Sequence, residues 1–226
     1  MTHHRRRNNG TDPSKINETV ELSPAQRYAA FKQTQAKQRT GAAEFARSMP
    51  FELDEFQMQA NDALEAGDNV LVAAPTGAGK TVAADFAIYL AQTRNVKAFY
   101  TTPIKALSNQ KYHDLVDQYG TDKVGLLTGD TSINSEADIV VMTTEVLRNM
   151  LYEHSVTLEA LRYVILDEVH YLADRFRGPV WEEVIIHLPK NVNIIGLSAT
   201  VSNVEDFSEW IESVRGKTTL VMSEQR

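Results

Sequence analysis

The feature that most constrains this chain is a regular alternation of short apolar runs with longer amphipathic segments. Each run is too short for a helix, and most are rich in β-branched side chains. The seven runs are Val70–Ala73, Ala98–Tyr100, Val124–Leu127, Ile139–Met142, Tyr163–Leu166, Ile194–Leu197 and Thr219–Val221. Continuous apolar runs of this kind are typical of parallel strands that are buried on both faces.

The segments between these runs show helical spacing of their apolar residues. The clearest are Thr81–Gln92, Lys105–Tyr119 and Thr144–Tyr152. Alternating strands and helices predict an α/β fold with a doubly wound, mainly parallel sheet of about seven strands. Ligands of such sheets bind beyond the carboxyl ends of the strands. We therefore expect the functional residues in the loops that directly follow the apolar runs.

The length of 226 residues suits one sizeable domain with an appendage. The chain has no cysteine, which excludes disulfides and thiolate metal sites. No apolar run approaches a membrane span, and none follows the charged start Met1–Arg7, so neither a membrane anchor nor a secretory signal is expected. These features fit a cytoplasmic protein.

Composition divides the chain into three parts. Residues 1–20 are polar and predicted to be a disordered tail. Residues 21–48 are predicted to be a helical extension. In it, Ser23 and Pro24 start a helix that runs to near Arg39, Gly41 breaks it, and a short helix covers Ala42–Arg47. Residues 49–226 hold all the apolar runs and form the predicted α/β domain.

Charge is unevenly divided between these parts. Residues 1–50 hold nine Lys/Arg and four Asp/Glu, a balance of +5, and the remaining residues hold 14 and 26, a balance of −12, which together give the net charge of −7. An acidic domain offers no broad basic field to a nucleic acid. Any polynucleotide must therefore be held by local donors such as backbone amides and a few well-placed side chains.

The first apolar run is followed by a glycine-rich loop that continues into a helix. The loop reads Ala74-Pro75-Thr76-Gly77-Ala78-Gly79-Lys80-Thr81. Its glycines allow the backbone to wrap around phosphate oxygens, and the helix start adds a positive dipole end. Lys80 is placed to contact the β- and γ-phosphates of ATP, and Thr81 to offer a hydroxyl ligand to Mg²⁺. The strand before and the helix after make an incidental glycine turn a poor alternative.

The run Tyr163–Leu166 is followed by an acidic box. This box reads Asp167-Glu168-Val169-His170. Asp167 is placed to hold Mg²⁺, and Glu168 to orient or deprotonate the attacking water. An isolated Asp-Glu pair is usually a solvated turn, but this pair ends a buried strand in a chain with a complete phosphate loop.

Together these motifs resemble those of the superfamily 2 DExH-box helicases. Residues 102–112 (TPIKALSNQKY) resemble motif Ia, and residues 142–148 (MTTEVLR) resemble motif Ib. Residues 198–200 (SAT) resemble motif III. The resemblance covers roughly residues 51–221. Residues 103–111, 144–152 and 177–183 are closest to the superkiller, exosome-associated RNA helicases, and among them to the bacterial members.

This resemblance implies further roles for individual residues. It implies a RecA-like fold and adenine contacts from Phe51, by stacking, and Gln57, by hydrogen bonding, although Phe51 could equally be a core aromatic. It gives His170, Ser198, Ala199 and Thr200 the task of coupling nucleotide state to domain geometry. Trp181 and Glu182 are expected to be structural.

The loops of motif Ia, motif Ib and residues 127–130 all follow predicted strands. They should therefore line one rim of the sheet and bind the sugar-phosphate backbone of single-stranded RNA without reading its bases. The residues predicted to bind are Pro103, Lys105, Ala106, Thr128, Gly129, Asp130, Thr144, Glu145 and Arg148. Lys105 and Arg148 could instead be ordinary surface charges of amphipathic helices.

Helicases of this family need a second RecA-like domain, which supplies arginine fingers and half of the RNA track. The residues up to Arg226 cannot accommodate one, so we expect this chain alone to bind nucleotide but to be nearly inactive. The family implies 3′ to 5′ unwinding, and an RNA-degradation complex as partner. A DNA helicase of the same superfamily, a non-catalytic scaffold with a vestigial nucleotide site, and another phosphate-loop NTPase are the alternatives.

Overall fold

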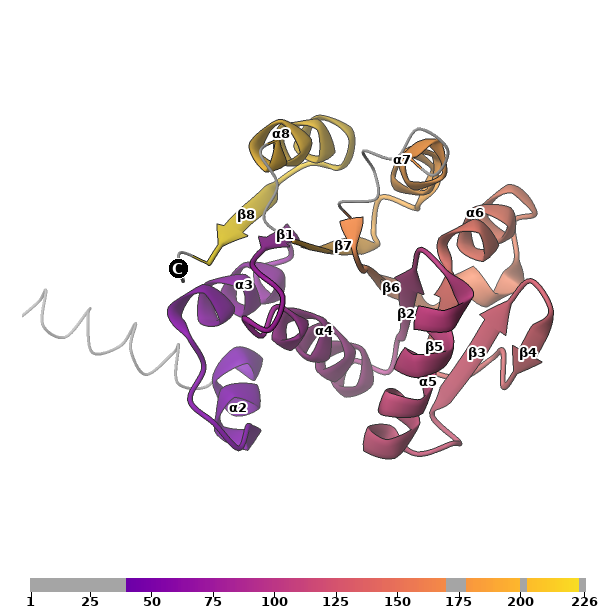
Figure 1. The fold of residues 1–226 in the computed structure, drawn as a ribbon, viewed down its shortest axis with the longest axis horizontal. Coiled ribbons are helices and arrows are strands. Elements are labelled where there is room, and N and C mark those ends of the chain that lie inside the picture. The colour runs from indigo at the N-terminus through magenta and orange to yellow at the C-terminus, as the bar shows by residue number, and fades with distance from the viewer. Residues whose placement is uncertain (1–39, 170–177, 200–202, 224–226) are drawn as a thin grey trace, which may run out of the picture. The chain divides into compact units, whose positions relative to one another are not determined.

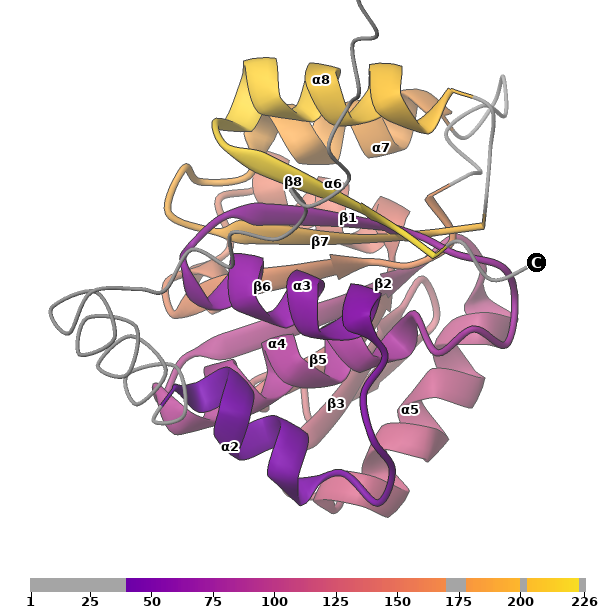
Figure 2. The ribbon, with the colours of Figure 1, turned by 90° about the vertical axis from the view of Figure 1, so that its left-hand side faces the viewer.

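The computed structural model describes residues 40–169, 178–199 and 203–223, which form a single eight-stranded sheet with helices on both faces (Figures 1 and 2). The strand order is β4-β3-β5-β2-β6-β7-β1-β8. All neighbouring strands are parallel except β3 and β4, which are antiparallel. No helix in the described ranges is long and apolar enough to span a membrane.

The seven predicted strands are all present. They are β1 (Asn69–Ala73), β2 (Lys97–Thr102), β3 (Val124–Thr128), β5 (Ile139–Thr143), β6 (Leu161–Leu166), β7 (Asn193–Ser198) and β8 (Thr218–Met222). The eighth strand, β4 (Thr131–Ile133), was not predicted. It is short, polar and largely exposed at the edge of the sheet, so it lacks the apolar pattern of a buried strand.

Two layers of helices cover the sheet. One layer contains α2 (Gly41–Ser48), α3 (Glu55–Glu65), α4 (Thr81–Thr93) and α5 (Lys105–Tyr119), and the other contains α6 (Thr144–Tyr152), α7 (Gly178–His187) and α8 (Val204–Arg215) (Figure 2). A short 3₁₀ helix, η1 (Val156–Leu158), precedes β6. Consecutive strand residues alternate between the two cores: Tyr100 packs in the core with Phe86, and Phe99 in the core with Trp181. Trp181 is buried, as expected of a structural residue, whereas Glu182, expected to share that role, is exposed.

The helix α2 belongs to the α/β domain rather than to a separate extension. Thr40 caps its start, and the amides of Gly41 and Ala42 donate to the Glu65 carboxylate at 2.7 and 3.1 Å. The ring of Phe45 packs against Phe86, with 5.2 Å between ring centroids. Gly41 is thus the first residue of this helix, and the compact unit begins at Thr40 rather than near residue 49. The predicted tail and the helix starting at Ser23 lie outside the described residues.

Strand register brings the functional loops to one edge of the sheet. Ala73 at the end of β1 is level with Ser198 at the end of β7, and Thr102 at the end of β2 is level with Thr143 at the end of β5. Leu166, the last residue of β6, is level with Thr101. The loops that follow these strands therefore leave the sheet at a common edge.

Candidate nucleotide site and nucleic-acid rim

The phosphate loop connects β1 to α4 and has the backbone geometry that its glycines allow. Gly77 and Gly79 both have positive φ, at 85° and 80°, where a side chain would be strained. Thr76 and Gly77 are exposed, and Ala78 and Gly79 are partly exposed, whereas Lys80 is only 9% exposed. Thr81 opens α4 and is exposed, which leaves its hydroxyl accessible to a ligand. The loop can therefore present its amides, an ammonium group and a hydroxyl at the start of one helix.

Gln57 supports this loop from α3. Its Nε2 donates to the carbonyl of Gly79 at 3.0 Å, and its Oε1 accepts from the amide of Asp54 at 2.9 Å. A Cβ added to Gly79 would lie 2.4 Å from Nε2 of Gln57. Gln57 thus closes the capping box of α3 and fixes the loop, and one Nε2 hydrogen remains for another acceptor.

Phe51 lies before α3 and is 50% exposed, so it is not the core aromatic that its sequence also allowed. An exposed ring is available for stacking on a planar ligand. The predicted adenine contacts of Phe51 and Gln57 stay predictions: the Phe51 ring is exposed, whereas Gln57 is only 5% exposed and its amide already bonds to Asp54 and Gly79.

The acidic box begins directly beyond β6. The Asp167 amide continues the sheet pairing by donating to the Thr101 carbonyl at 3.0 Å, and its Oδ1 accepts from the Glu168 amide at 2.9 Å. Glu168 has a φ of +57°, which is rare for a residue with a side chain and costs roughly 1–3 kcal/mol. Such backbone strain is concentrated at functional sites, because surrounding structure must maintain it.

A tyrosine that the sequence did not single out contacts Asp167. The Tyr100 hydroxyl donates to Asp167 Oδ2 at 2.7 Å. Burial of Tyr100 raises its pKa well above the usual value of 10, and the charge and hydrogen bond of Asp167 raise the pKa further. Tyr100 therefore remains a protonated donor. Sequence reasoning treated it as a core residue of an apolar run, and no local signal distinguishes it from one.

The phosphate loop and the acidic box lie two strand positions apart, because β7 separates β1 from β6. Strand spacing places the two strand ends about 10 Å apart. β7 pairs with both strands, and at its end the Ser198 carbonyl accepts from the Ala74 amide at 3.1 Å. Ser198 is buried and its hydroxyl donates to the Ala199 carbonyl at 2.8 Å. His170 and Thr200, which were predicted to share the coupling role, lie outside the described residues.

Within the described part of the chain, no cluster of three or more His, Asp or Glu side chains could hold a metal ion. Mg²⁺ does not require such a cluster, because it keeps several waters and takes one or two carboxylates plus substrate phosphates. The exposed Thr81 hydroxyl and the Asp167 carboxylate fit this donor set.

The predicted nucleic-acid rim is built around the ends of β2, β3 and β5. Thr144, at the start of α6, is buried and its hydroxyl donates to the Thr102 carbonyl at 3.3 Å. The Thr102 hydroxyl is 2.7 Å from the Ser108 hydroxyl of α5. The Thr144 hydroxyl therefore connects the two motifs rather than facing solvent, and a phosphate contact here falls to the backbone amides of Thr144 and Glu145.

The start of α5 has a similar arrangement. Pro103 is buried and has no N–H, and the helix begins at Lys105. The amides of Leu107 and Ser108 donate to the Ile104 carbonyl. The amides of Lys105 and Ala106, both exposed residues in the first turn, are those that a helix leaves for an external acceptor.

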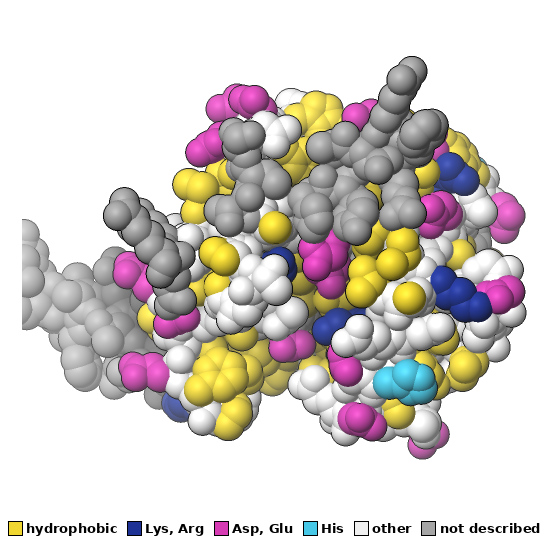
Figure 3. Space-filling model, in the orientation of Figure 1, with side chains coloured by type: hydrophobic (Ala, Val, Ile, Leu, Met, Phe, Trp, Pro, Cys, Tyr) yellow, Lys and Arg dark blue, Asp and Glu magenta, His cyan; other side chains and the backbone are white. Residues whose placement is uncertain are grey.

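The rim cations are paired with acidic side chains. Lys105 Nζ lies 2.5 Å from Asp130 Oδ2, and Thr128 also donates to Asp130, at 3.0 Å. The hydrogen bonds from Lys105 and Thr128 lower the pKa of Asp130. Arg148 Nε lies 3.7 Å from Glu183 Oε2 of α7. Figure 3 shows described Lys and Arg side chains only in small groups among acidic and apolar ones, with no broad basic patch on that face.

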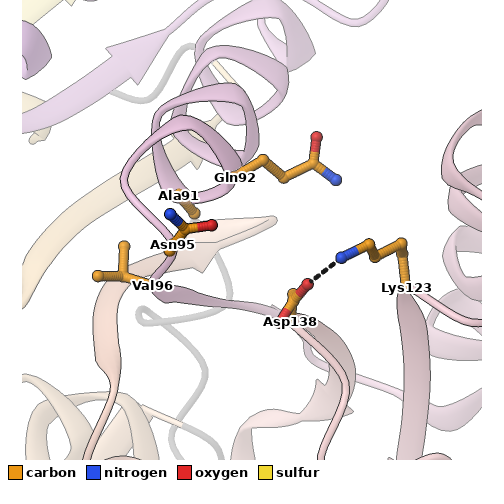
Figure 4. Close-up of a pocket in the computed structure, with 6 residues that line it drawn as sticks. All are labelled: Ala91, Gln92, Asn95, Val96, Lys123 and Asp138. Carbon is orange, nitrogen blue, oxygen red and sulfur yellow. Dashed lines mark hydrogen bonds and ion pairs between the residues drawn. The ribbon is translucent and has the colours of Figure 1, made fainter.

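A hollow of about 290 Å³ lies at the opposite edge of the sheet. It is lined by the end of α4 and by residues just before β2, β3 and β5: Ala91, Gln92, Asn95, Val96, Lys123 and Asp138 (Figure 4). Its two charged side chains are paired with each other, at 2.6 Å. The hollow is thus separate from the loops at the carboxyl ends of the strands.

Comparison with known proteins gives consistent matches. Residues 54–207 match the DEAD/DEAH box helicase family. The probable helicase HelY of Mycobacterium tuberculosis is 62% identical over 182 residues, which are 80% of this chain and 20% of HelY. Human superkiller complex protein 2 is 53% identical over 76% of this chain and 14% of its own length. The chain therefore spans about a fifth or less of these relatives.

A plant relative and a solved structure extend the comparison. The DExH-box ATP-dependent RNA helicase DExH11 of Arabidopsis thaliana is 51% identical over 77% of this chain and 13% of its own length. The structure of the DUF1998 helicase MrfA bound to DNA and AMPPNP superposes with a TM-score of 0.65 at 28% identity, covering 80% of this chain and 28% of MrfA. The predicted fold class and the predicted superkiller-type resemblance are both confirmed.

Proposed function

The chain belongs to the DEAD/DEAH box helicase family, and from that membership we propose that it is the ATP-binding motor domain of an ATP-dependent RNA helicase. One observation carries the proposal. A loop with two positive-φ glycines and a largely buried Lys80 lies at the same sheet edge as Asp167, and β7 lies between the two strands that these loops follow. This arrangement matches the needs of phosphoryl transfer, in which positioning and electrostatic stabilisation supply most of the catalysis.

Each residue of the site has a role that its environment supports. The loop amides of residues 76–79 and the Lys80 ammonium bind the phosphates. Thr81 and Asp167 hold Mg²⁺, which neutralises charge on the phosphates when it is bound. Glu168, presented by a strained backbone, orients the attacking water. Phe51 and Gln57 contact the adenine.

RNA is the proposed polynucleotide, held at the rim by the starts of α5 and α6. Support comes from the 51% identity to a plant protein named as an RNA helicase. A DNA helicase is the second candidate, because MrfA, at 28% identity, was crystallised with DNA. The backbone amides at the rim would contact the sugar-phosphate backbone of the strand, so we expect no base preference.

The proposed cycle needs a second RecA-like domain, in keeping with the fifth or less of the relatives that this chain spans. We infer that the domain described here binds ATP but turns it over slowly, since loss of an arginine finger typically costs about 10³–10⁵ in rate. The whole protein is proposed to act in RNA degradation, with 3′ to 5′ polarity, in the cytoplasm.

Nucleotide binding is tested with a fluorescent ADP analogue titrated with the 226-residue chain in Mg²⁺ buffer. Lys80→Ala should weaken binding at least about tenfold, because a charged hydrogen-bonding partner contributes roughly 1.5–3 kcal/mol. Lys123→Ala is the matched control: Lys123 lies at the opposite sheet edge and pairs with Asp138. Equal binding by wild type and Lys80→Ala would refute the assigned phosphate site.

The choice between RNA and DNA is tested by competition. Single-stranded RNA and DNA of identical sequence compete for the whole helicase with a labelled RNA strand, in the presence of a non-hydrolysable ATP analogue. Tighter binding of RNA supports the proposal, because the 2′-hydroxyl is what distinguishes the two backbones. Equal or tighter binding of DNA favours the second candidate.

A further inference from the structure

Both oxygens of the Asp167 carboxylate are held by donors that come from different parts of the fold. Oδ1 accepts the amide of the next residue, Glu168, at 2.9 Å. Oδ2 accepts the hydroxyl of Tyr100 at 2.7 Å, from the neighbouring strand β2. Two fixed donors, one on each oxygen, determine the orientation of the carboxylate plane. Each oxygen keeps a further lone pair for another partner.

The donor itself is firmly placed. Tyr100 is 1% exposed and lies in the middle of the sheet, level with Ile165 of β6. The ammonium of Lys111, on α5, lies 5.2 Å from the centroid of its ring, within cation–π distance. Asp85 of α4 and Asp167 both act electrostatically on the hydroxyl, and both favour its protonated, donating form. The Tyr100 hydroxyl thus has one fixed location and one fixed role as donor.

We propose that Tyr100 is a positioning residue for the Mg²⁺ carboxylate: its hydroxyl orients Asp167 so that the free lone pairs of the carboxylate face the metal and its waters. The proposal deepens the proposed function and rests on it. Donors to metal-binding groups typically contribute about 10–100-fold to metal affinity when they are fixed in this way. The pairing of β2 with β6 and the cation–π contact with Lys111 of α5 fix the donor.

Tyr100→Phe isolates the hydroxyl, because it keeps the ring, the burial and the cation–π contact. Tyr163→Phe is a matched control: Tyr163 is a buried tyrosine on the adjacent strand β6, and its hydroxyl accepts from Arg94 at 2.5 Å, away from the acidic box. Both variants remove one hydroxyl and one hydrogen bond from the same sheet. Thermal unfolding of both, followed by circular dichroism, verifies that each chain folds.

The measurement is the affinity of the 226-residue chain for a fluorescent ADP analogue, in EDTA and at a series of Mg²⁺ concentrations. For Tyr100→Phe we expect the half-saturating Mg²⁺ concentration to rise about tenfold, the lower end of the range for such donors. Its affinity in EDTA should equal that of wild type. Tyr163→Phe should match wild type in both conditions.

Two results overturn the proposal. A Tyr100→Phe chain with wild-type Mg²⁺ dependence shows that the hydroxyl does not orient the metal carboxylate. Equal loss of affinity with and without Mg²⁺ shows that Tyr100 supports the fold of the whole site. A wild-type chain that binds no nucleotide refutes the proposed function instead, and is recognised from the wild-type titration alone.

Discussion

Asp85 lies on α4, one helical turn beyond Thr81, and is partly buried. Burial is the main cause that raises its pKa from 3.8 to about 6, and the positive charge of Lys111 partly opposes that rise. The hydroxyls of Tyr100 and Tyr119 lie close enough for Asp85 to raise their pKa values. The carboxylate thus interacts electrostatically with one cation and two phenols, and the rise in its pKa means that its ionised form is disfavoured in the folded chain.

The sign of the effect on stability follows from proton binding. Between pH 4 and 6 the folded chain keeps the Asp85 proton while the unfolded chain loses it. The free energy of unfolding therefore falls as the pH rises through this range, and the stability that the protonated carboxyl allows at low pH is lost by about pH 6. A shift of about two units corresponds to about 3 kcal/mol. Asp85 is partly exposed, which lowers the expected cost of its charge at neutral pH to roughly 1–3 kcal/mol.

Asp85→Asn should therefore stabilise the chain at pH 8 and change its stability little at pH 4. For a domain of this size, 1 kcal/mol shifts Tm by roughly 2–4 °C, so the gain at pH 8 is about 2–12 °C. Thermal unfolding across this pH range measures it, and Asp138→Asn, an exposed carboxylate paired with Lys123, is the control. A variant whose Tm parallels wild type at every pH, or falls at pH 8, would refute the reasoning.

Two further changes test the packing. Asn61 is 1% exposed, and neither polar atom of its amide has a hydrogen-bond partner among the described residues. Asn61→Leu, of the same branching, should therefore raise the unfolding free energy by about 1–3 kcal/mol in urea titrations. A loss of stability would mean that the site cannot hold the larger methyl groups. A Cβ added to Gly125 would lie 2.1 Å from the carbonyl oxygen of Asn134, so Gly125→Ala should lower Tm by several degrees. A Cβ added to Gly129 would meet open space, so Gly129→Ala is the control and should leave Tm unchanged. Equal Tm values for the two variants would contradict this reasoning.

Strands buried on both faces could be predicted from the sequence because their apolar pattern is continuous. The helices Lys105–Tyr119 and Thr144–Tyr152 could be predicted to the residue, because their apolar residues have helical spacing and each helix starts within three residues of a strand end. The helix Glu55–Glu65 was not predicted. Its start carries a capping box formed by Asp54 and Gln57, and this local signal could have revealed it.

The contacts within the site were beyond sequence reasoning for a different reason. Tyr100 reaches Asp167 only because β2 pairs with β6, although 67 residues separate the two side chains in the chain. Likewise, Gln57 reaches the Gly79 carbonyl only because α3 packs beside α4. Such contacts depend on which strands and helices become neighbours, and local residue patterns do not specify that choice.

The rim charges bear on how an acidic domain can hold RNA. Lys105 is bound to Asp130 and Arg148 to Glu183, so neither cation adds a full unpaired charge to the surface. Each ion pair keeps its cation at a rim position beside a helix start, α5 or α6. Attraction to phosphate must then come mainly from the first-turn amides of these helices. These amides act only on phosphates that come close to the helix start, so they favour one path for the RNA backbone across the rim. Local amides in place of a basic field explain how the net charge of −7 is compatible with the proposed RNA binding.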